Sequence, residues 1–190
     1  MIMKHAKHFL LMAAMLLCSI SASAHDFVKN GIFYKAPRQI DLADLTVMVT
    51  YFDPDNDSGY STFKNEYRGR VVIPSTVTYE GMTFRVTRID NDAFRECDAL
   101  TSVVIPSTIE SIGDWAFAGC SSLTSIIIPK SVESIGYCAF RYCSNLISIT
   151  IPEGVTSIGS EAFSYCSSLT SITIPKSVMS IENYTFGGCI

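Results

Sequence analysis

The sequence repeats itself every 23 residues from Ile89 onward. A proline, a phenylalanine, a cysteine, an isoleucine and a leucine each recur once per repeat. The clearest columns are Pro106, Pro129, Pro152 and Pro175; Phe94, Phe117, Phe140, Phe163 and Phe186; and Cys97, Cys120, Cys143, Cys166 and Cys189. A regular period of about 20–29 residues with spaced aliphatic side chains predicts a solenoid, in which each coil packs only against its neighbours.

The repeat unit of residues 123–143 shows how one coil is expected to form. The run from Leu123 to Pro129 is β-branched and alternating, which predicts a strand that ends at the proline. Gly136 is expected to be a turn residue, and residues 137–142 a short helical turn. The side chains expected to point inward are Leu123, Ile126, Ile128, Val132, Ile135, Ala139, Phe140 and Cys143. One coil cannot bury this set alone. The period therefore predicts a leucine-rich-repeat type solenoid with a parallel sheet on its concave face and helical turns on its convex side.

Two segments carry a resemblance to a known family. The runs Leu-Thr-Ser-Ile-Ile-Ile-Pro-Lys-Ser-Val-Glu-Ser-Ile-Gly (123–136) and Ala-Phe-Arg-Tyr-Cys (139–143) resemble the BspA-like leucine-rich repeats of secreted and surface proteins of Bacteroidetes. The resemblance extends from about residue 71 to the end, and residues 45–51 and 72–79 are similar to N-terminal parts of such proteins. It implies a role in adhesion and protein binding.

The ends of the array are expected to differ from its centre. Residues 25–73 are expected to form a β-rich N-terminal cap, with strands at 31–34, 45–51 and 70–73, because a solenoid must cover its terminal apolar face. The interval from Pro74 to Pro106 is 32 residues, nine more than the period, which predicts a hairpin around residues 79–82. The array is assigned to residues 74–190. Because no capping segment follows Gly187, we expect the sequence to be part of a longer protein.

Residues 1–24 have the features of a secretory signal peptide. Lys4 and Lys7 precede an apolar run over residues 9–20, and Ala-Ser-Ala at 22–24 supplies small residues for cleavage. The run is shorter than the ~20 apolar residues that cross a bilayer, which disfavours a retained anchor. Leu17, directly before Cys18, disfavours lipidation. We expect a secreted or cell-surface protein with no membrane-spanning segment after cleavage.

Composition disfavours several classes of function. The only histidines are His5, His8 and His25, so the repeat array has none for a catalytic triad or a zinc site. Removal of Lys4 and Lys7 with the leader leaves 12 basic residues against 18 acidic ones, which disfavours a nucleic-acid surface. We therefore expect a protein that is not an enzyme and has no cofactor or metal.

Cysteine spacing separates two kinds of thiol. The five cysteines in the repeated column are expected to be free, buried and packed as small apolar groups; disulfides are the alternative for an exported chain. Cys138 lies outside the column, and its expected place in the convex turn makes it the candidate for a reactive or bridging thiol. The spacing lacks the close cysteine pairs typical of zinc sites.

Three weaker motifs have ordinary explanations. The run from Asp53 to Gly59 resembles a calcium loop, but Ser58 and Lys64 stand where an EF-hand needs glycine and glutamate, which favours a solvated turn. The sequons at Asn56 and Asn183 matter only in a eukaryotic secretory route. The aromatic row of the convex turns could bind sugar or protein, or only shield the coil; its members are Trp115, Tyr137, Tyr142, Tyr165 and Tyr184.

The outward positions of the repeated strand form the candidate binding site. Alternation places two uncharged columns on the concave face: Ser102, Val104, Ser125, Ile127, Ser148, Thr150, Ser171 and Thr173. Good strand-forming residues explain these columns without any function, whereas a platform for a protein ligand is a common use of such solenoids. The partner would be a host extracellular-matrix or plasma protein or another bacterial surface protein. The alternative function is a structural spacer that presents a further C-terminal domain.

Overall fold

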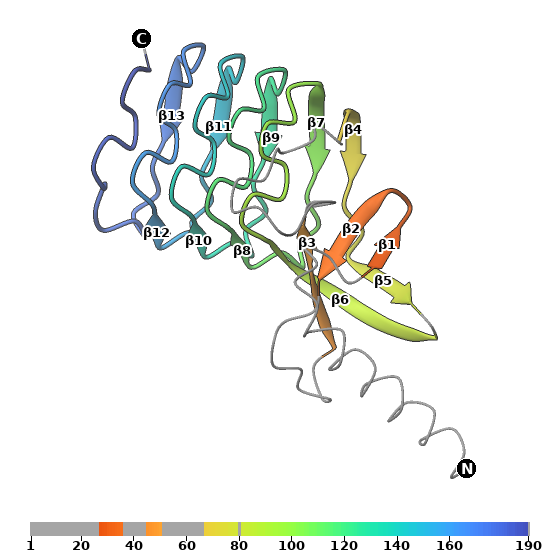
Figure 1. Cartoon of the computed structure of the whole chain (residues 1–190). Coiled ribbons are helices and arrows are strands. Elements are labelled where there is room, and N and C mark those ends of the chain that lie inside the picture. The colour runs from red at the N-terminus through yellow and green to blue at the C-terminus, as the bar shows by residue number, and fades with distance from the viewer. Residues whose placement is uncertain (1–26, 36–44, 51–66, 80, 190) are drawn as a thin grey trace, which may run out of the picture.

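The computed structural model describes residues 27–35, 45–50, 67–79 and 81–189. The expected signal peptide, the acidic run at 53–59 and the sequon at Asn56 lie outside these residues. Across the described ranges, no helix is long and apolar enough to cross a membrane. The described chain consists of short strands and turns that form stacked coils, with additional strands at the N-terminal end (Figure 1).

The N-terminal strands form a small sheet that joins the array through one long strand. Strands β1 (Phe27–Lys29), β2 (Ile32–Lys35) and β3 (Thr46–Thr50) pair in antiparallel order, and β3 then pairs in parallel with β6 (Met82–Ile89). The expected hairpin is confirmed, because β5 (Thr76–Tyr79) pairs antiparallel with the first half of β6. The end of β6 pairs in parallel with the first coil, so β6 belongs to both parts.

The repeated strand predicted from the sequence is confirmed as a row of parallel strands, here called the first sheet. Its members are β4 (Gly69–Val72), β7 (Leu100–Val104), β9 (Ser125–Ile127), β11 (Ser148–Thr150) and β13 (Ser171–Thr173). Strand β4 pairs with β7, β9 pairs with β11 and β11 pairs with β13, all in parallel. The two ladders meet where β7 of the first lies beside β9 of the second. The eight side chains expected to point inward from one coil are all buried.

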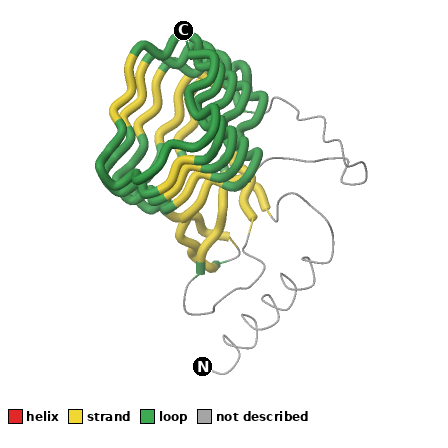
Figure 2. The backbone as a smooth tube through the Cα atoms, turned by 90° about the vertical axis from the view of Figure 1, so that its left-hand side faces the viewer, coloured by secondary structure: helices red, strands yellow, loops and turns green. Residues whose placement is uncertain are grey.

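A second parallel sheet, not anticipated from the sequence, runs along another side of the coils. It consists of β8 (Ser111–Ile112), β10 (Ser134–Ile135) and β12 (Ser157–Ile158), and it continues into β6 and β3. Strands β8, β10 and β12 are each only two residues long, and the isoleucine of each points inward. The view along the coils shows the two strand-bearing sides and the loop side (Figure 2).

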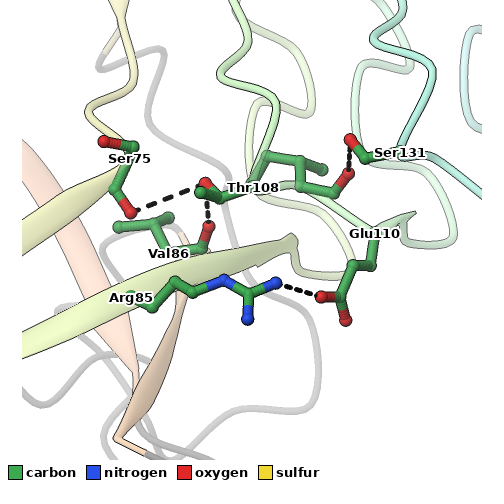
Figure 3. Close-up of polar contacts among 7 residues, drawn as sticks. Ser75, Arg85, Val86, Thr108, Glu110 and Ser131 are labelled. Atoms are coloured by element: carbon green, nitrogen blue, oxygen red, sulfur yellow. Dashed lines mark hydrogen bonds and ion pairs between the residues drawn. The ribbon is translucent and has the colours of Figure 1, made fainter.

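Hydroxyl groups add bonds between coils close to the second sheet. Thr108 donates to the carbonyl of Val86, and Ser131 donates to the carbonyl of Ile109, both at 2.6 Å (Figure 3). Beside them, Arg85 of β6 forms an exposed ion pair with Glu110. Each such hydroxyl reaches the preceding coil, so the bonds hold neighbouring coils together.

The expected helical turns are not confirmed; the third side of each coil is an irregular turn. Two residues per coil are left-handed: Asp92, Trp115, Cys138, Glu161 and Tyr184 in one column, and Glu96, Gly119, Tyr142, Tyr165 and Gly188 in the other. A positive φ interrupts a right-handed helix. The backbone N–H groups instead bond to the next coil, as when Phe140 donates to the carbonyl of Ala162 at 2.7 Å. These turns are therefore a third ladder between coils.

The phenylalanine column forms a stack through the centre of the array. Neighbouring ring centroids lie 4.9, 5.2, 5.4 and 5.7 Å apart from Phe94 to Phe186, and the planes differ by at most 9°. Tyr67 covers the N-terminal end, with its ring 4.6 Å from that of Phe94. Its hydroxyl donates to the carbonyl of Thr50 at 2.8 Å and accepts the N–H of Phe33 at 3.1 Å. Tyr67 thus connects the N-terminal strands to the core of the array.

The cysteine column agrees with the prediction of free thiols, and the prediction for Cys138 is wrong. All six cysteines of the described chain are free, and five are buried. Column thiols donate to the carbonyl of a phenylalanine 26 residues earlier, at 3.1–3.2 Å. Cys138 has no exposed surface, because its left-handed backbone directs the thiol inward beside Arg141. Cys189 is the partly exposed thiol.

Gly136 has a different role from the one expected. Its φ is not positive, so the turn does not require a glycine for its backbone angle. A Cβ atom there would lie 2.5 Å from Oδ1 of Asp114 and 2.6 Å from its backbone nitrogen. The glycine therefore permits close approach of the preceding coil.

Candidate protein-binding face

The eight residues proposed from the sequence lie together on the outer surface of the first sheet, here called the strand face. The pairing places Ser125, Ser148 and Ser171 side by side, and it places Ile127, Thr150 and Thr173 in a second row. Ile127 is 83% exposed and Val104 is 40% exposed, whereas Ser102 is partly covered. Between the two rows, Ile126 and Ile149 point into the core. Alternation along each strand therefore gives the two columns that the sequence predicts.

Strand β4 adds two residues to this surface that the sequence analysis missed. Arg70 pairs with Ser102, and Val72 pairs with Val104, so each extends one of the two rows. Both side chains are exposed, and Val72 is 54% exposed. A signal was present in the sequence: Arg70 and Val72 precede Pro74 by the same steps as Ser102 and Val104 precede Pro106.

Charge and polarity vary along the strand face. Val72, Val104 and Ile127 form an exposed apolar stretch over three neighbouring strands. Ile147, directly before β11, is 54% exposed. Threonine replaces the aliphatic residues on β11 and β13. Within the five strands, the only charged side chain is that of Arg70. The charged residues Lys130, Glu153 and Lys176 are exposed at the margin, after the prolines.

The aromatic row predicted for the turns is present; four of its five rings contact a neighbouring ring, whereas Tyr184 is 77% exposed. The guanidinium carbon of Arg95 lies 4.5 Å from the centroid of the Trp115 ring. The rings of Tyr142 and Tyr165 stack at 4.8 Å, and Arg141 lies 4.9 Å and 5.6 Å from their centroids.

Ion pairing completes this cluster. Nη1 of Arg141 lies 2.7 Å from Oε2 of Glu161, which neutralises the guanidinium charge. A sugar-binding platform needs an open ring face, and the Tyr142 and Tyr165 rings stack on each other. For these two rings the geometry favours the shielding interpretation over sugar binding.

The chemistry available on the strand face is that of recognition. It presents hydroxyl groups, aliphatic side chains and one guanidinium group. Four of the five column thiols are buried, and burial raises the pKa of Cys120 and Cys143 above the ordinary value of a thiol. Within the described ranges, no group of three potential ligand side chains could hold a metal ion.

Comparison with known proteins agrees with this architecture. A family model described as "BspA type Leucine rich repeat region" matches six copies over residues 59–190. A leucine-rich repeat protein of Bacteroides ovatus is 34% identical, with a TM-score of 0.58; the match covers 87% of this chain and 45% of that one. A leucine-rich repeat protein of T. pallidum is 27% identical, with a TM-score of 0.68, and the match covers 86% and 67% of the two chains.

A third similar solved structure is that of a leucine-rich cell surface protein from Faecalibacterium prausnitzii. It is 30% identical, with a TM-score of 0.60, and the match covers 85% of this chain and 46% of that one. The chain thus spans about half to two thirds of the length of these three proteins. The search of curated proteins gave no significant match.

Proposed function

This chain belongs to the BspA-type leucine-rich-repeat family, and we propose that its strand face binds another protein outside the cell. The signal-like leader and the surface location named for the Faecalibacterium protein support export. The partner is then a host extracellular-matrix or plasma protein or another bacterial surface protein. The module acts by adhesion, without catalysis.

The observation that carries this proposal is the uncharged, exposed surface of strands β7 to β13. The centres of protein interfaces are depleted of charged residues, and their margins are polar. The strand face has this arrangement, with Ile127 near its centre and Lys130 and Glu153 at its margin. Paired strands fix the positions of these side chains, so little order has to be gained on binding.

The test places charge in the centre of this surface. A double variant with Ile127→Arg and Thr150→Arg should lose capture of a plasma or matrix protein. Both side chains are exposed, so the arginines can reach water and the array should keep its unfolding curve. The matched control carries Ser157→Arg and Met179→Arg, two exposed positions outside the first sheet, and should still capture the partner.

The alternative function is a spacer that holds another domain away from the cell. It is favoured by the ladders on three sides of each coil, which resist bending between coils. A spacer needs no free face. If the unmodified protein captures nothing from plasma or matrix extracts, the spacer becomes the better proposal; loss of capture only in the control variant would move the site away from the strand face.

A further inference from the structure

We infer that the strand face selects an extended segment of its partner that carries an acidic residue two positions away from an aliphatic one. This inference rests on the proposed function and specifies the partner's chemistry. It depends on the two residues of β4, Arg70 and Val72, which give the face a distinct end.

The first observation is that both rows of the strand face change character along the array. One row begins with Arg70 and continues with Ser102, Ser125, Ser148 and Ser171. The other begins with Val72, Val104 and Ile127 and continues with Thr150 and Thr173. The end near β4 is therefore cationic and apolar, whereas the end near β13 is neutral and rich in hydroxyl groups.

The second observation is that Arg70 has no acidic partner among the described residues. Of the six arginines in the described chain, Arg68 and Arg70 form no ion pair with another described residue, and the other four do: Arg85, Arg88, Arg95 and Arg141. Arg70 is exposed instead, on the same side of its strand as Val72. A guanidinium group binds a carboxylate through two parallel hydrogen bonds, so a carboxylate is the complementary group for this end of the face.

The third observation concerns spacing. Arg70 and Val72 lie two positions apart on one strand, which is about 6.4–6.8 Å. An extended partner segment presents its side chains on one side with the same spacing. An acidic side chain above Arg70 therefore places the residue two positions away above Val72, beside Val104. An aliphatic residue there would cover part of the apolar stretch, whereas a charged one would lose its hydration without compensation.

The complementary segment is thus of the form acidic–any–aliphatic in an extended conformation. A nucleic acid is not the occupant that this surface fits, because it requires several clustered cations. The strand face offers one.

A charge-reversal selection tests the inference. A randomised linear peptide library displayed on phage is selected at low salt against the wild-type protein, Arg70→Glu, and the Ile127→Arg, Thr150→Arg double variant. The wild type should enrich Asp or Glu two positions from Val, Ile or Leu. The Arg70→Glu protein should enrich Lys or Arg in place of the acidic residue. The double variant interrupts the apolar stretch and adds two cations, so it should keep the acidic preference and lose the fixed aliphatic position.

Synthetic peptides from the selection give the magnitude. Exchange of the acidic residue for lysine should weaken binding to the wild type about two- to five-fold and improve binding to Arg70→Glu, because exposed ion pairs contribute little each. Arg70→Gln, which removes the charge without reversing it, should bind both peptides alike. Unfolding curves for each variant establish that it folds.

The outcomes separate the two proposals. Two results would overturn the inference and leave the binding function intact. In the first, the peptides enriched on the wild type carry no acidic residue. In the second, the wild type and Arg70→Glu enrich the same motif. No enrichment on the wild type above the uncoated support would overturn both. Concentration-dependent dimerisation lost in the double variant would assign the face to a second copy, and the inference would fail.

Discussion

Replacement of Phe117 by alanine should destabilise the array strongly, because this ring lies in the middle of the phenylalanine stack. Phe117 has no exposed surface, and its ring lies parallel to Phe94 at 4.9 Å and to Phe140 at 5.2 Å. Phe→Ala changes in packed cores cost about 3–5 kcal/mol. Each aromatic pair adds about 0.5–1.5 kcal/mol beyond the buried area. With two pairs lost, we expect a cost in the upper half of the 3–5 kcal/mol range.

Urea unfolding at equilibrium measures this cost. The single tryptophan, Trp115, lies in the same coil and reports on it by fluorescence, while circular dichroism reports on the strands. Phe186→Ala is the matched control, because Phe186 is partly exposed and has one ring neighbour, at 5.7 Å. Its cost should be about half that of Phe117→Ala, since it loses one stacking partner and less buried area. Phe117→Leu, which keeps most of the volume, should fall between the variant and wild type.

An unfolding midpoint unchanged by Phe117→Ala would show that the ring is not packed in the core. Equal costs for the two alanine variants would contradict the argument in another way. They would mean that stacking on both sides adds nothing to stability.

Three further predictions test other parts of the structure. A thiol reagent should label Cys189 first in the native protein and should leave Cys138 unlabelled until denaturation, because Cys138 is fully buried; early labelling of Cys138 by mass spectrometry would contradict its placement. Tyr67→Phe should cost about 1–2 kcal/mol in urea unfolding, since it leaves a backbone carbonyl and an N–H without their shared hydroxyl. Gly136→Ala should cost about 1–3 kcal/mol, because the added methyl would overlap Asp114 of the preceding coil; a neutral effect on the melting temperature would show that the coils are not so close.

Much of the fold could be predicted because identical residues recur in identical surroundings. Phenylalanine and cysteine recur at a fixed step, at Phe140 and Cys143 in one coil. In a solenoid, equivalent residues of stacked coils pack against one another, so such a recurrence indicates a buried column. The strand from Leu123 to Pro129 was predictable from β-branched alternation. The outward position of Ile127 followed from the same alternation, and the pairing confirms it.

The turns were less predictable, because left-handed backbone is adopted here by residues of ordinary type. Trp115, Cys138 and Glu161 occupy one such column, although bulky residues seldom have a positive φ. Asp92 in the same column and Gly119 in the neighbouring one were the local signals. Hydrogen bonds to the next coil hold these angles, and a single repeat contains no trace of them.

The second sheet and the contribution of β4 were missed for a related reason. Ser134 and Ile135 form a strand of two residues, too short for any alternation to be visible. Position 70 precedes the regular part of the period, and it is occupied by arginine where the later coils have serine. Its distance of four residues from Pro74 was the signal, and the pairing of β4 with β7 establishes its place beside Ser102.

The bonds between coils also determine how the gene for such a chain can change in length. A turn N–H donates to a carbonyl 22 residues ahead, and a column thiol donates to one 26 residues behind. Duplication of 23 codons preserves every such pair, whereas one inserted codon shifts all later donors in that coil. The nine additional residues between Pro74 and Pro106 are accommodated because the β5–β6 hairpin extends away from the coils (Figure 1). Natural variants should therefore differ by whole coils, or by insertions that leave the stack as hairpins of their own.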